Sequence, residues 1–292
     1  MPPAIPVAPP IHAVRAAVRA ALAEDLTPLG DLSAALIPVD ATAEASFVPR
    51  EAGTVAGTVC ATEAFAQVDD AVVVEWHVAD GDDVEPGQVL GTASGPLAPI
   101  LSAERTALNF LCHLSGIASM TARFSAAAAS GGSARIWDTR KTTPGLRSLE
   151  KAAVRAGGGA SHRGNLSDWV MLKDNHLAVL GISASVVVAR DTWPARTIHV
   201  EVDDLDALRE ALDAATDAIL LDNFSPDEAA EAVAVVDEWE RKTGRHRPWI
   251  ECSGGITLDT AAAYAASGVD LLSTSQITQS AAALDIGLDI RS

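Results

Sequence analysis

Short apolar runs alternate with alanine-rich stretches from about residue 135 onward, and this alternation restricts the possible fold most strongly. Each run is followed by polar residues, and the runs begin at Ile136, Val170, Ile198, Ile219, Trp249 and Leu271. Buried strands separated by helices in this way are typical of βα units in a parallel sheet. We count about six or seven units, which favours an α/β barrel that need not be complete. An open doubly wound sheet is the alternative fold.

The first part of the chain has a different pattern. Residues 11–26 repeat Ala, Val and Leu at helical spacing, which predicts an amphipathic helix. Short apolar stretches separated by Gly, Asp and Pro then predict strands at 45–48, 54–60, 72–78 and 88–93, and a helix at 62–68. A long helical stretch over about 99–130, in which Gly116 is a candidate break, is expected to connect this small α+β region to the α/β units.

Positive charge is concentrated in one segment of an acidic chain. The whole chain has a formal net charge of -18, but residues 135–176 hold eight Lys and Arg against four Asp and Glu. A focused cationic segment of this kind predicts a pocket for a small, multiply charged anion. The acidic remainder argues against a nucleic-acid or membrane-surface partner, because such a partner requires a broad basic face.

The cysteines and the start of the chain indicate the compartment. Cys60, Cys112 and Cys252 are widely spaced and form no metal-ligand pattern, so we expect reduced core thiols without a disulfide or zinc site. Residues 1–10 are rich in proline and lack the features of a signal peptide or anchor, which predicts a disordered lead-in. Together these features predict a cytoplasmic protein.

Polar residues at the ends of the predicted strands define a candidate site. The carboxyl ends of parallel strands meet at one rim, which here would carry Arg140, Lys141, Lys173, Glu201, Asp222 and Ser253. The cationic members suit carboxylates or phosphates, and the carboxylates suit a hydrated Mg²⁺ or sugar hydroxyls. The turn 253–257 follows a strand and is expected to open a helix, which suits a phosphate. This set predicts a phosphorylated sugar beside an anionic co-substrate.

Each of these residues also has an ordinary structural interpretation. A carboxylate after a strand is commonly a cap or an ion-pair partner, and a Ser-Gly-Gly turn is commonly only a turn. His199 alternates with core positions of its strand, so we expect it to pack rather than to catalyse. The joint occurrence of these residues on successive strand ends favours the functional interpretation.

The motif between Asp138 and Arg147 strongly resembles that of the quinolinate phosphoribosyltransferase family. Further blocks of the same resemblance are Gly157–Gly159, His162–Arg163, Lys173–His176, Glu104–Asn109, Glu201–Asp203, Leu221–Asn223 and Ser253–Ile256. The resemblance extends over nearly the whole chain after the proline-rich start.

The resemblance implies an α/β fold with two domains. These are a small N-terminal α/β sandwich over residues 11–130, including the connecting helices, and a C-terminal incomplete α/β barrel over 131–292. The tail, about 284–292, is a candidate to return to the N-terminal domain. The implied reaction joins quinolinate to phosphoribosyl pyrophosphate with Mg²⁺ and gives nicotinate mononucleotide, pyrophosphate and CO₂. The implied assembly is a homodimer, or a higher oligomer, in which two subunits share each active site.

The resemblance also implies roles for individual residues. Lys141, Glu201 and Asp222 would be catalytic, and Glu201 and Asp222 would hold the hydrated metal. The implied substrate-binding residues are Arg105 from the partner subunit, Arg140, His162, Arg163, Lys173, Ser253, Gly254, Gly255, Ser275 and Gln279.

Two of these positions depart from the family pattern. Ser275 and Gln279 stand where a glycine and a histidine are usual in the last phosphate-binding turn. Gln279 can donate a hydrogen bond but carries no charge. These departures leave open a paralogue that binds the ligand or regulates without catalysis. A second alternative is transfer to another acid, such as nicotinate without decarboxylation.

Overall fold

A computed structural model describes residues 8–291 of the chain, so most of the predicted lead-in lies outside the described residues. The described chain divides into two compact units. The first contains residues 8–122, 142–158 and 277–291, and the second contains 123–141 and 159–276. No helix among the described residues is long and apolar enough to cross a membrane.

The first unit is built on an antiparallel sheet of four strands in the order β12-β1-β5-β3. These strands are β1 (Thr42–Pro49), β3 (Val73–Trp76), β5 (Gly91–Pro96) and β12 (Ile286–Arg291), and a small ladder joins β2 (Gly53–Thr54) to β4 (Asp83–Val84). Its helices are α1 (Ile11–Leu26), α2 (Thr58–Val68) and α4 (Arg147–Ala156), with a short 3-10 helix at Ala34–Leu36. The predicted first helix is confirmed, since α1 buries Val14, Val18 and Leu22 on one face.

The predicted strand at 54–60 is wrong beyond Thr54, because helix α2 begins at Thr58. Asp80 explains this start. Its carboxylate accepts hydrogen bonds from the backbone N–H groups of Gly57 and Thr58, at 3.0 and 3.1 Å, and from the Thr58 hydroxyl at 2.7 Å. A carboxylate at the first turn of a helix satisfies N–H groups that have no partner within the helix. The start of α2 is therefore fixed by Asp80, which is distant in sequence.

Helix α3 (Leu97–Gly131) runs from the first unit into the second without a break at Gly116. A side chain at Gly116 would collide with the backbone carbonyl of Ala282. Glycine at this position therefore permits a close backbone approach rather than ending the helix.

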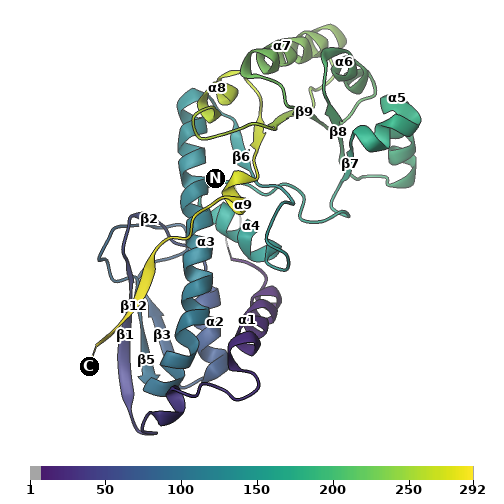
Figure 1. Ribbon diagram of the computed structural model, residues 1–292. Coiled ribbons are helices and arrows are strands. Elements are labelled where there is room, and N and C mark those ends of the chain that lie inside the picture. The colour runs from purple at the N-terminus through teal and green to yellow at the C-terminus, as the bar shows by residue number, and fades with distance from the viewer. Residues whose placement is uncertain (1–7, 292) are drawn as a thin grey trace. The chain divides into compact units, whose positions relative to one another are not determined.

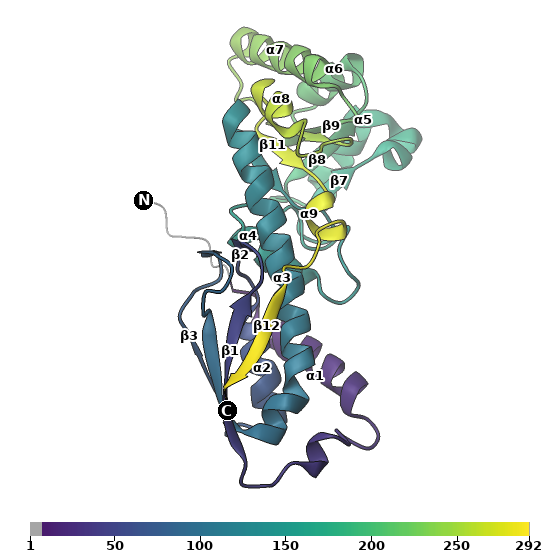
Figure 2. The same ribbon diagram turned by 60° about the vertical axis from the view of Figure 1, so that its left-hand side comes forward.

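Two later segments fall in the first unit: the tail, a candidate to return there, and segment 142–158, which the sequence predicts in the C-terminal domain. The last strand, β12, pairs antiparallel with β1, with Phe47 opposite Leu288 (Figure 2). Segment 142–158 carries α4, which contacts α1, and Gly157 lies directly against the backbone of Ala118 in the first-unit part of α3. Strand pairing and close packing place these segments in the first unit. Their position in the chain, after the first domain, does not reveal this.

The second unit contains a parallel sheet of six strands in the order β6-β11-β10-β9-β8-β7 (Figure 1). These are β6 (Arg135–Trp137), β7 (Val170–Leu172), β8 (Ile198–Val202), β9 (Ala218–Asp222), β10 (Trp249–Ser253) and β11 (Leu271–Ser273). The helices of this part of the chain are α5 (Asp174–Thr192), α6 (Leu205–Asp213), α7 (Pro226–Thr243), α8 (Ala261–Ala266) and the short α9 (Gln276–Gln279), whose last three residues belong to the first unit. All six strands predicted from the apolar runs are therefore present.

The strand order distinguishes a barrel from a doubly wound sheet. Successive strands from β7 to β11 are neighbours, and β6 follows β11, so the order never reverses in the middle of the sheet. The edge strands β6 and β7 approach each other, since the rings of Trp137 and Trp169 are 6.1 Å apart. The sheet is thus a barrel that lacks strand pairing between β6 and β7, as the sequence predicts.

The segment after α4 lies along the open edge of β6. Ala160 forms an isolated bridge with Trp137, and its N–H donates to the carbonyl of Ile136 at 2.8 Å. His162 and Arg163 follow immediately, so this pairing brings them to the same end of the sheet as the residues after β6.

Candidate active site

The carboxyl ends of the strands in the second unit surround a pocket with a volume of about 210 Å³. Its lining consists of Thr139, Arg140, Lys141, His162, Arg163, Met171, Lys173, Leu220, Glu251, Ser253 and Ser273. These residues come from β7, β9, β10 and β11 and from the segments after β6, β7 and Ala160. Four of the six predicted rim residues line this pocket, namely Arg140, Lys141, Lys173 and Ser253.

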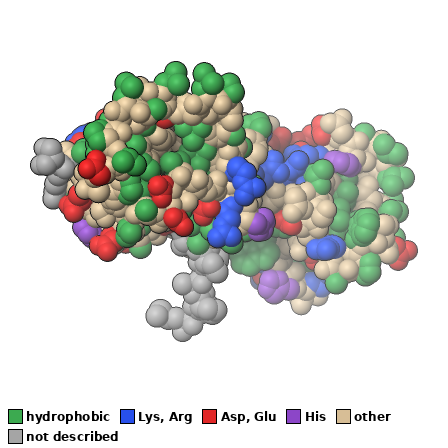
Figure 3. All heavy atoms as spheres, turned by 90° about the horizontal axis from the view of Figure 1, so that it is seen from below, with side chains coloured by type: hydrophobic (Ala, Val, Ile, Leu, Met, Phe, Trp, Pro, Cys, Tyr) green, Lys and Arg blue, Asp and Glu red, His purple; other side chains and the backbone are tan. Residues whose placement is uncertain are grey.

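The pocket is strongly cationic. Arg163 is buried, with 8% of its surface exposed, and burial and then the neighbouring Arg140 charge lower the pKa of its guanidinium. Figure 3 shows acidic side chains dispersed over one face of the molecule. Two guanidinium groups at one pocket repel each other, so an anionic ligand that accepts hydrogen bonds from both would be favoured.

The backbone around His162 is fixed by a buried acid. The His162 N–H donates to Oδ1 of Asp138 at 2.8 Å, and Asp138 is fully buried. The imidazole packs edge-on against the rings of Trp169 and Trp137, at 4.8 and 5.7 Å. These contacts hold the ring of His162 in place at the wall of the pocket.

Lys173 links the cationic residues to the predicted catalytic carboxylates. Its ammonium group is paired with the carboxylate of Glu201 at the end of β8. The Lys173 backbone N–H donates to Nδ1 of His176 at 3.1 Å at the start of α5. The sequence assigned Lys173 and Glu201 to different ligands, and the structure brings their side chains into contact.

Asp222 lies at the end of β9 and lines a second hollow with a volume of about 260 Å³. The other lining residues are Asp203, Asp204, Leu205, Asn223, Phe224, Glu228 and Glu231. The Asn223 side chain donates to Oδ2 of Asp222 at 2.8 Å. Carboxylate and carbonyl oxygens are the ligands that Mg²⁺ prefers, and a hollow of this size has room for a hydrated ion. The acidic lining of this hollow therefore suits a hydrated cation such as Mg²⁺, and Glu201 is not part of that lining.

The turn after β10 is tightly constrained. Gly254 and Gly255 have φ values of 90° and 66°, and a side chain at Gly254 would collide with Asn223. The turn does not open directly into a helix as expected, because α8 begins only at Ala261. A phosphate at this position would therefore be bound by the backbone of the turn and not by the N-terminus of a helix.

The structure places the predicted site residues unequally. Arg140, Lys141, His162, Arg163, Lys173 and Ser253 line the cationic pocket. Asp222 lines the acidic hollow, Glu201 contacts Lys173, Gly254 and Gly255 form the turn, and Ser275 follows β11. Arg105, which is exposed on α3, and Gln279 belong to the first unit, so their roles in this site stay predictions.

Sequence reasoning missed Glu251. This residue is fully buried, and its Oε2 atom lies 3.5 Å from Nε2 of both His162 and His199. Burial opposes its ionisation, but its contacts with the two imidazoles hold its pKa below the usual value. The available signal was an acid inside the apolar run Trp249–Cys252, since a strand core rarely contains an unpaired charge.

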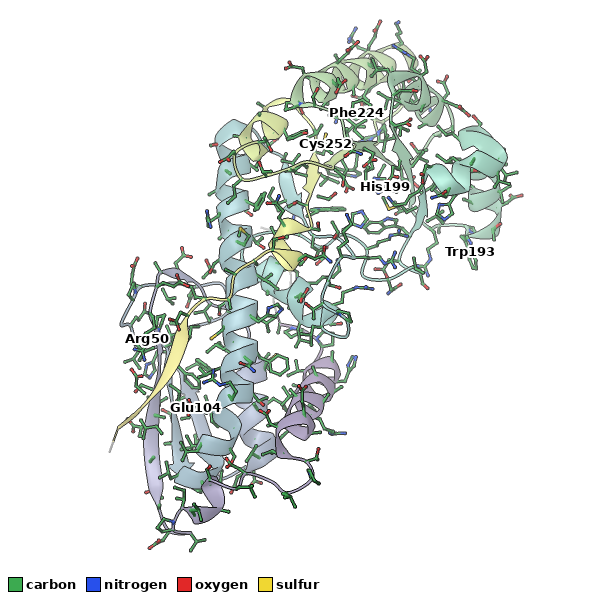
Figure 4. The ribbon with its side chains drawn as sticks, viewed as in Figure 1. Arg50, Glu104, Trp193, His199, Phe224 and Cys252 are labelled. Carbon is green, nitrogen blue, oxygen red and sulfur yellow. The ribbon has the colours of Figure 1, made fainter. Side chains whose placement is uncertain are left out.

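His199 is a packed core residue, as expected, with 1% of its surface exposed. It lies inside the second unit (Figure 4). Burial lowers the pKa of its imidazole to about 4, although Glu251 partly opposes this shift. His199 is therefore neutral near pH 7.

Family models match both parts of the chain. The N-terminal domain of quinolinate phosphoribosyl transferase matches residues 31–115, and the C-terminal domain of the same enzyme matches residues 117–289. The chain belongs to the quinolinate phosphoribosyltransferase family. The sequence resemblance is thus confirmed.

Relatives within this quinolinate phosphoribosyltransferase family are similar over nearly the full chain. A Mycobacterium leprae protein named nicotinate-nucleotide pyrophosphorylase (carboxylating) is 41% identical and covers 95% of this chain and 97% of its own. A probable enzyme of the same name from Bacillus subtilis is 40% identical and covers 89% and 88%. The solved structure of the nicotinate-nucleotide pyrophosphorylase from Francisella tularensis has a TM-score of 0.90 at 34% identity, covering 97% of both chains.

Proposed function

We propose that this protein transfers the phosphoribosyl group of phosphoribosyl pyrophosphate to quinolinate, in a Mg²⁺-dependent reaction that also releases CO₂. The products are nicotinate mononucleotide and pyrophosphate, as required for NAD biosynthesis. The observation that carries the proposal is the set of cationic side chains at one pocket of a chain whose family relatives are named for this reaction. We also propose that the enzyme is cytoplasmic, since its proposed substrates are small charged molecules.

The cationic pocket accounts for recognition of the acid. Quinolinate carries two adjacent carboxylates, and Arg140, Arg163 and Lys173 present donors to one pocket of about 210 Å³. Guanidinium groups bind carboxylates through paired hydrogen bonds, which fixes the plane of the ring. His162 adds a donor beside them, and Lys141, which lines the same pocket, would contact both the acid and a phosphate.

The carboxylates account for stabilisation of the transferred sugar. Displacement of pyrophosphate breaks the bond between the anomeric carbon and oxygen, and the pyridine nitrogen forms the new bond, so positive charge builds on the ribose. Glu201 and Asp222 favour that charge and accept hydrogen bonds from the ribose hydroxyls. Bound Mg²⁺, held by these two carboxylates through water, would supply charge neutralisation on the pyrophosphate side.

Loss of CO₂ needs little acid or base from the protein. The ribosylated pyridine nitrogen is cationic and stabilises the electron pair that stays on C2 when the bond from C2 to its carboxylate breaks. A proton from solvent or a neighbouring donor then replaces the carboxylate at C2. The role of the cationic side chains is to hold both carboxylates in a fixed orientation.

The turn formed by Ser253, Gly254 and Gly255 accounts for the 5′-phosphate. Its backbone can approach a ligand closely because two successive residues lack side chains. Ser275 follows a neighbouring strand, β11, and adds a hydroxyl. A role of Gln279 as an uncharged phosphate donor stays a prediction from the sequence.

We include a homodimer with a shared site in the proposal. Exposed apolar side chains support a subunit interface: Leu29, Leu36 and Val39 on the first unit and Val179 and Leu180 on the second. In such a dimer, Arg105 would complete the cationic pocket of the partner subunit.

The test is turnover by the purified protein. Incubation with quinolinate, phosphoribosyl pyrophosphate and Mg²⁺ should give nicotinate mononucleotide and CO₂ in equal amounts, and omission of Mg²⁺ should abolish both. Faster turnover of nicotinate than of quinolinate would instead support the alternative acid. Folded protein that binds quinolinate without turnover would support the non-catalytic paralogue and overturn the proposal.

A further inference from the structure

A single buried acid lies among the cations of the pocket. Of the described residues that line it, Glu251 is the one acid, and it is fully buried. Its Oε2 atom lies 3.5 Å from Nε2 of His162, which lines the same pocket. A carboxylate buried without a cationic partner would be strongly destabilising, so its charge must be balanced nearby.

His199 lies equally close to Glu251, but it packs in the core with 1% of its surface exposed and does not line the cationic pocket. His162 is the other imidazole in contact with Glu251, and it faces the pocket where a ligand carboxylate would bind. The charged and titratable groups around this pair are Asp138, Arg140, Arg163, Lys173 and His199.

We propose that Glu251 is a positioning residue that keeps the His162 imidazole charged and directed toward the carboxylate-binding pocket. The inference rests on the proposed function, because it assigns the pocket to a dicarboxylate. A charged imidazole donates a stronger hydrogen bond to a carboxylate than a neutral one. Glu251 therefore serves ligand binding through His162, without touching the ligand, and makes that binding insensitive to pH near neutrality.

The test uses Glu251→Gln, which keeps the shape of the side chain and removes its charge. The probe is phthalate, which has two adjacent ring carboxylates but no ring nitrogen and so cannot react. Its dissociation constant is measured by calorimetry from about pH 6 to about pH 8.5, across the usual range of histidine titration. Glu210→Gln is the matched control, because Glu210 is an exposed acid of the same unit, on α6.

The expected result is a change in pH dependence. Wild-type protein and Glu210→Gln should bind phthalate with nearly constant affinity over this range. Glu251→Gln should bind about tenfold more weakly at the alkaline end, the effect of one charge-assisted hydrogen bond, and should recover as the pH falls and His162 gains a proton. The double variant Glu251→Gln with His162→Gln should lose this recovery.

Other outcomes overturn the inference. If Glu251 acted only as a repulsive charge, Glu251→Gln would bind phthalate more tightly at every pH. If it acted only in packing, binding would weaken equally at every pH. Tight binding of Zn²⁺ to the wild-type cluster of His162, His199 and Glu251 would also overturn it, because a metal requires both imidazoles to be neutral.

One measurement does not depend on the variant being folded. Calorimetry of wild-type protein near pH 7, in buffers with different ionisation enthalpies, counts the protons taken up when phthalate binds. The inference requires almost none, since His162 is already charged, and uptake of about one proton contradicts it. Wild-type protein that neither binds phthalate nor turns over quinolinate would instead reject the proposed function itself.

Discussion

Replacement of Arg163 by Met should increase stability and reduce ligand binding at once. Arg163 is buried beside Arg140, and both burial and that like charge disfavour its ionised form. Methionine fills a similar volume without a charge. Because replacement of buried charges by apolar side chains can be stabilising, we expect the free energy of unfolding to rise by about 1–2 kcal/mol.

The same change should weaken binding of the dicarboxylate. A charged hydrogen-bonding group that contacts a ligand contributes about 1.5–3 kcal/mol, which corresponds to a loss of about 10- to 100-fold in phthalate affinity. Steady-state kinetics should show the loss mainly in the KM for quinolinate rather than for phosphoribosyl pyrophosphate. Opposite signs for stability and binding are typical of residues retained for function.

Urea unfolding and phthalate calorimetry measure the two effects separately. Arg163→Lys is the control, because it keeps a positive charge but loses the planar pair of donors. It should lose affinity without the gain in stability. An Arg163→Met protein that is less stable than the wild type, or that binds phthalate as tightly, would refute the reasoning.

Three further predictions concern other parts of the chain. Burial opposes ionisation of Glu150, but hydrogen bonds from His113 and the Thr143 backbone N–H hold its pKa below 4.5. Stability that is present above about pH 4.5 is therefore lost as the pH falls through the lower folded pKa, and Glu150→Gln should flatten the urea midpoints measured from about pH 6 to about pH 3. Gly254→Ala should raise the KM for phosphoribosyl pyrophosphate by about tenfold or more, because its φ of 90° disfavours a side chain, and an unchanged KM would argue against a phosphate at this turn. Arg105→Ala should abolish turnover alone yet regain part of it when mixed with Lys141→Ala, and no rescue between subunits that demonstrably exchange would argue against a shared site.

The pattern of apolar runs was sufficient to predict the α/β unit. Parallel strands are buried on both faces, so each appears as a continuous apolar run, and the polar residue after it lies at the carboxyl end. Lys173 and Ser253 could be placed at the pocket for this reason. The strands and the polar residues at their ends can therefore be predicted from short stretches of sequence alone.

Features that depend on distant partners could not be predicted in this way. Helix α2 begins where Asp80 caps it from another loop, which no local pattern near Thr58 records. The contacts of Glu251 also depend on distant residues, because its partners His162 and His199 come from other elements of the barrel. Segment 142–158 likewise belongs to the first unit because α4 packs against α1.

The pairing of β12 with β1 has a consequence for synthesis of the chain on the ribosome. The sheet that starts at Thr42 gains its outer strand only from Ile286–Arg291, which are translated more than two hundred residues later. A nascent chain must therefore hold an incomplete sheet edge while the whole parallel barrel emerges and folds. We expect loss of these final residues to impair the first unit rather than the barrel beside which they are encoded.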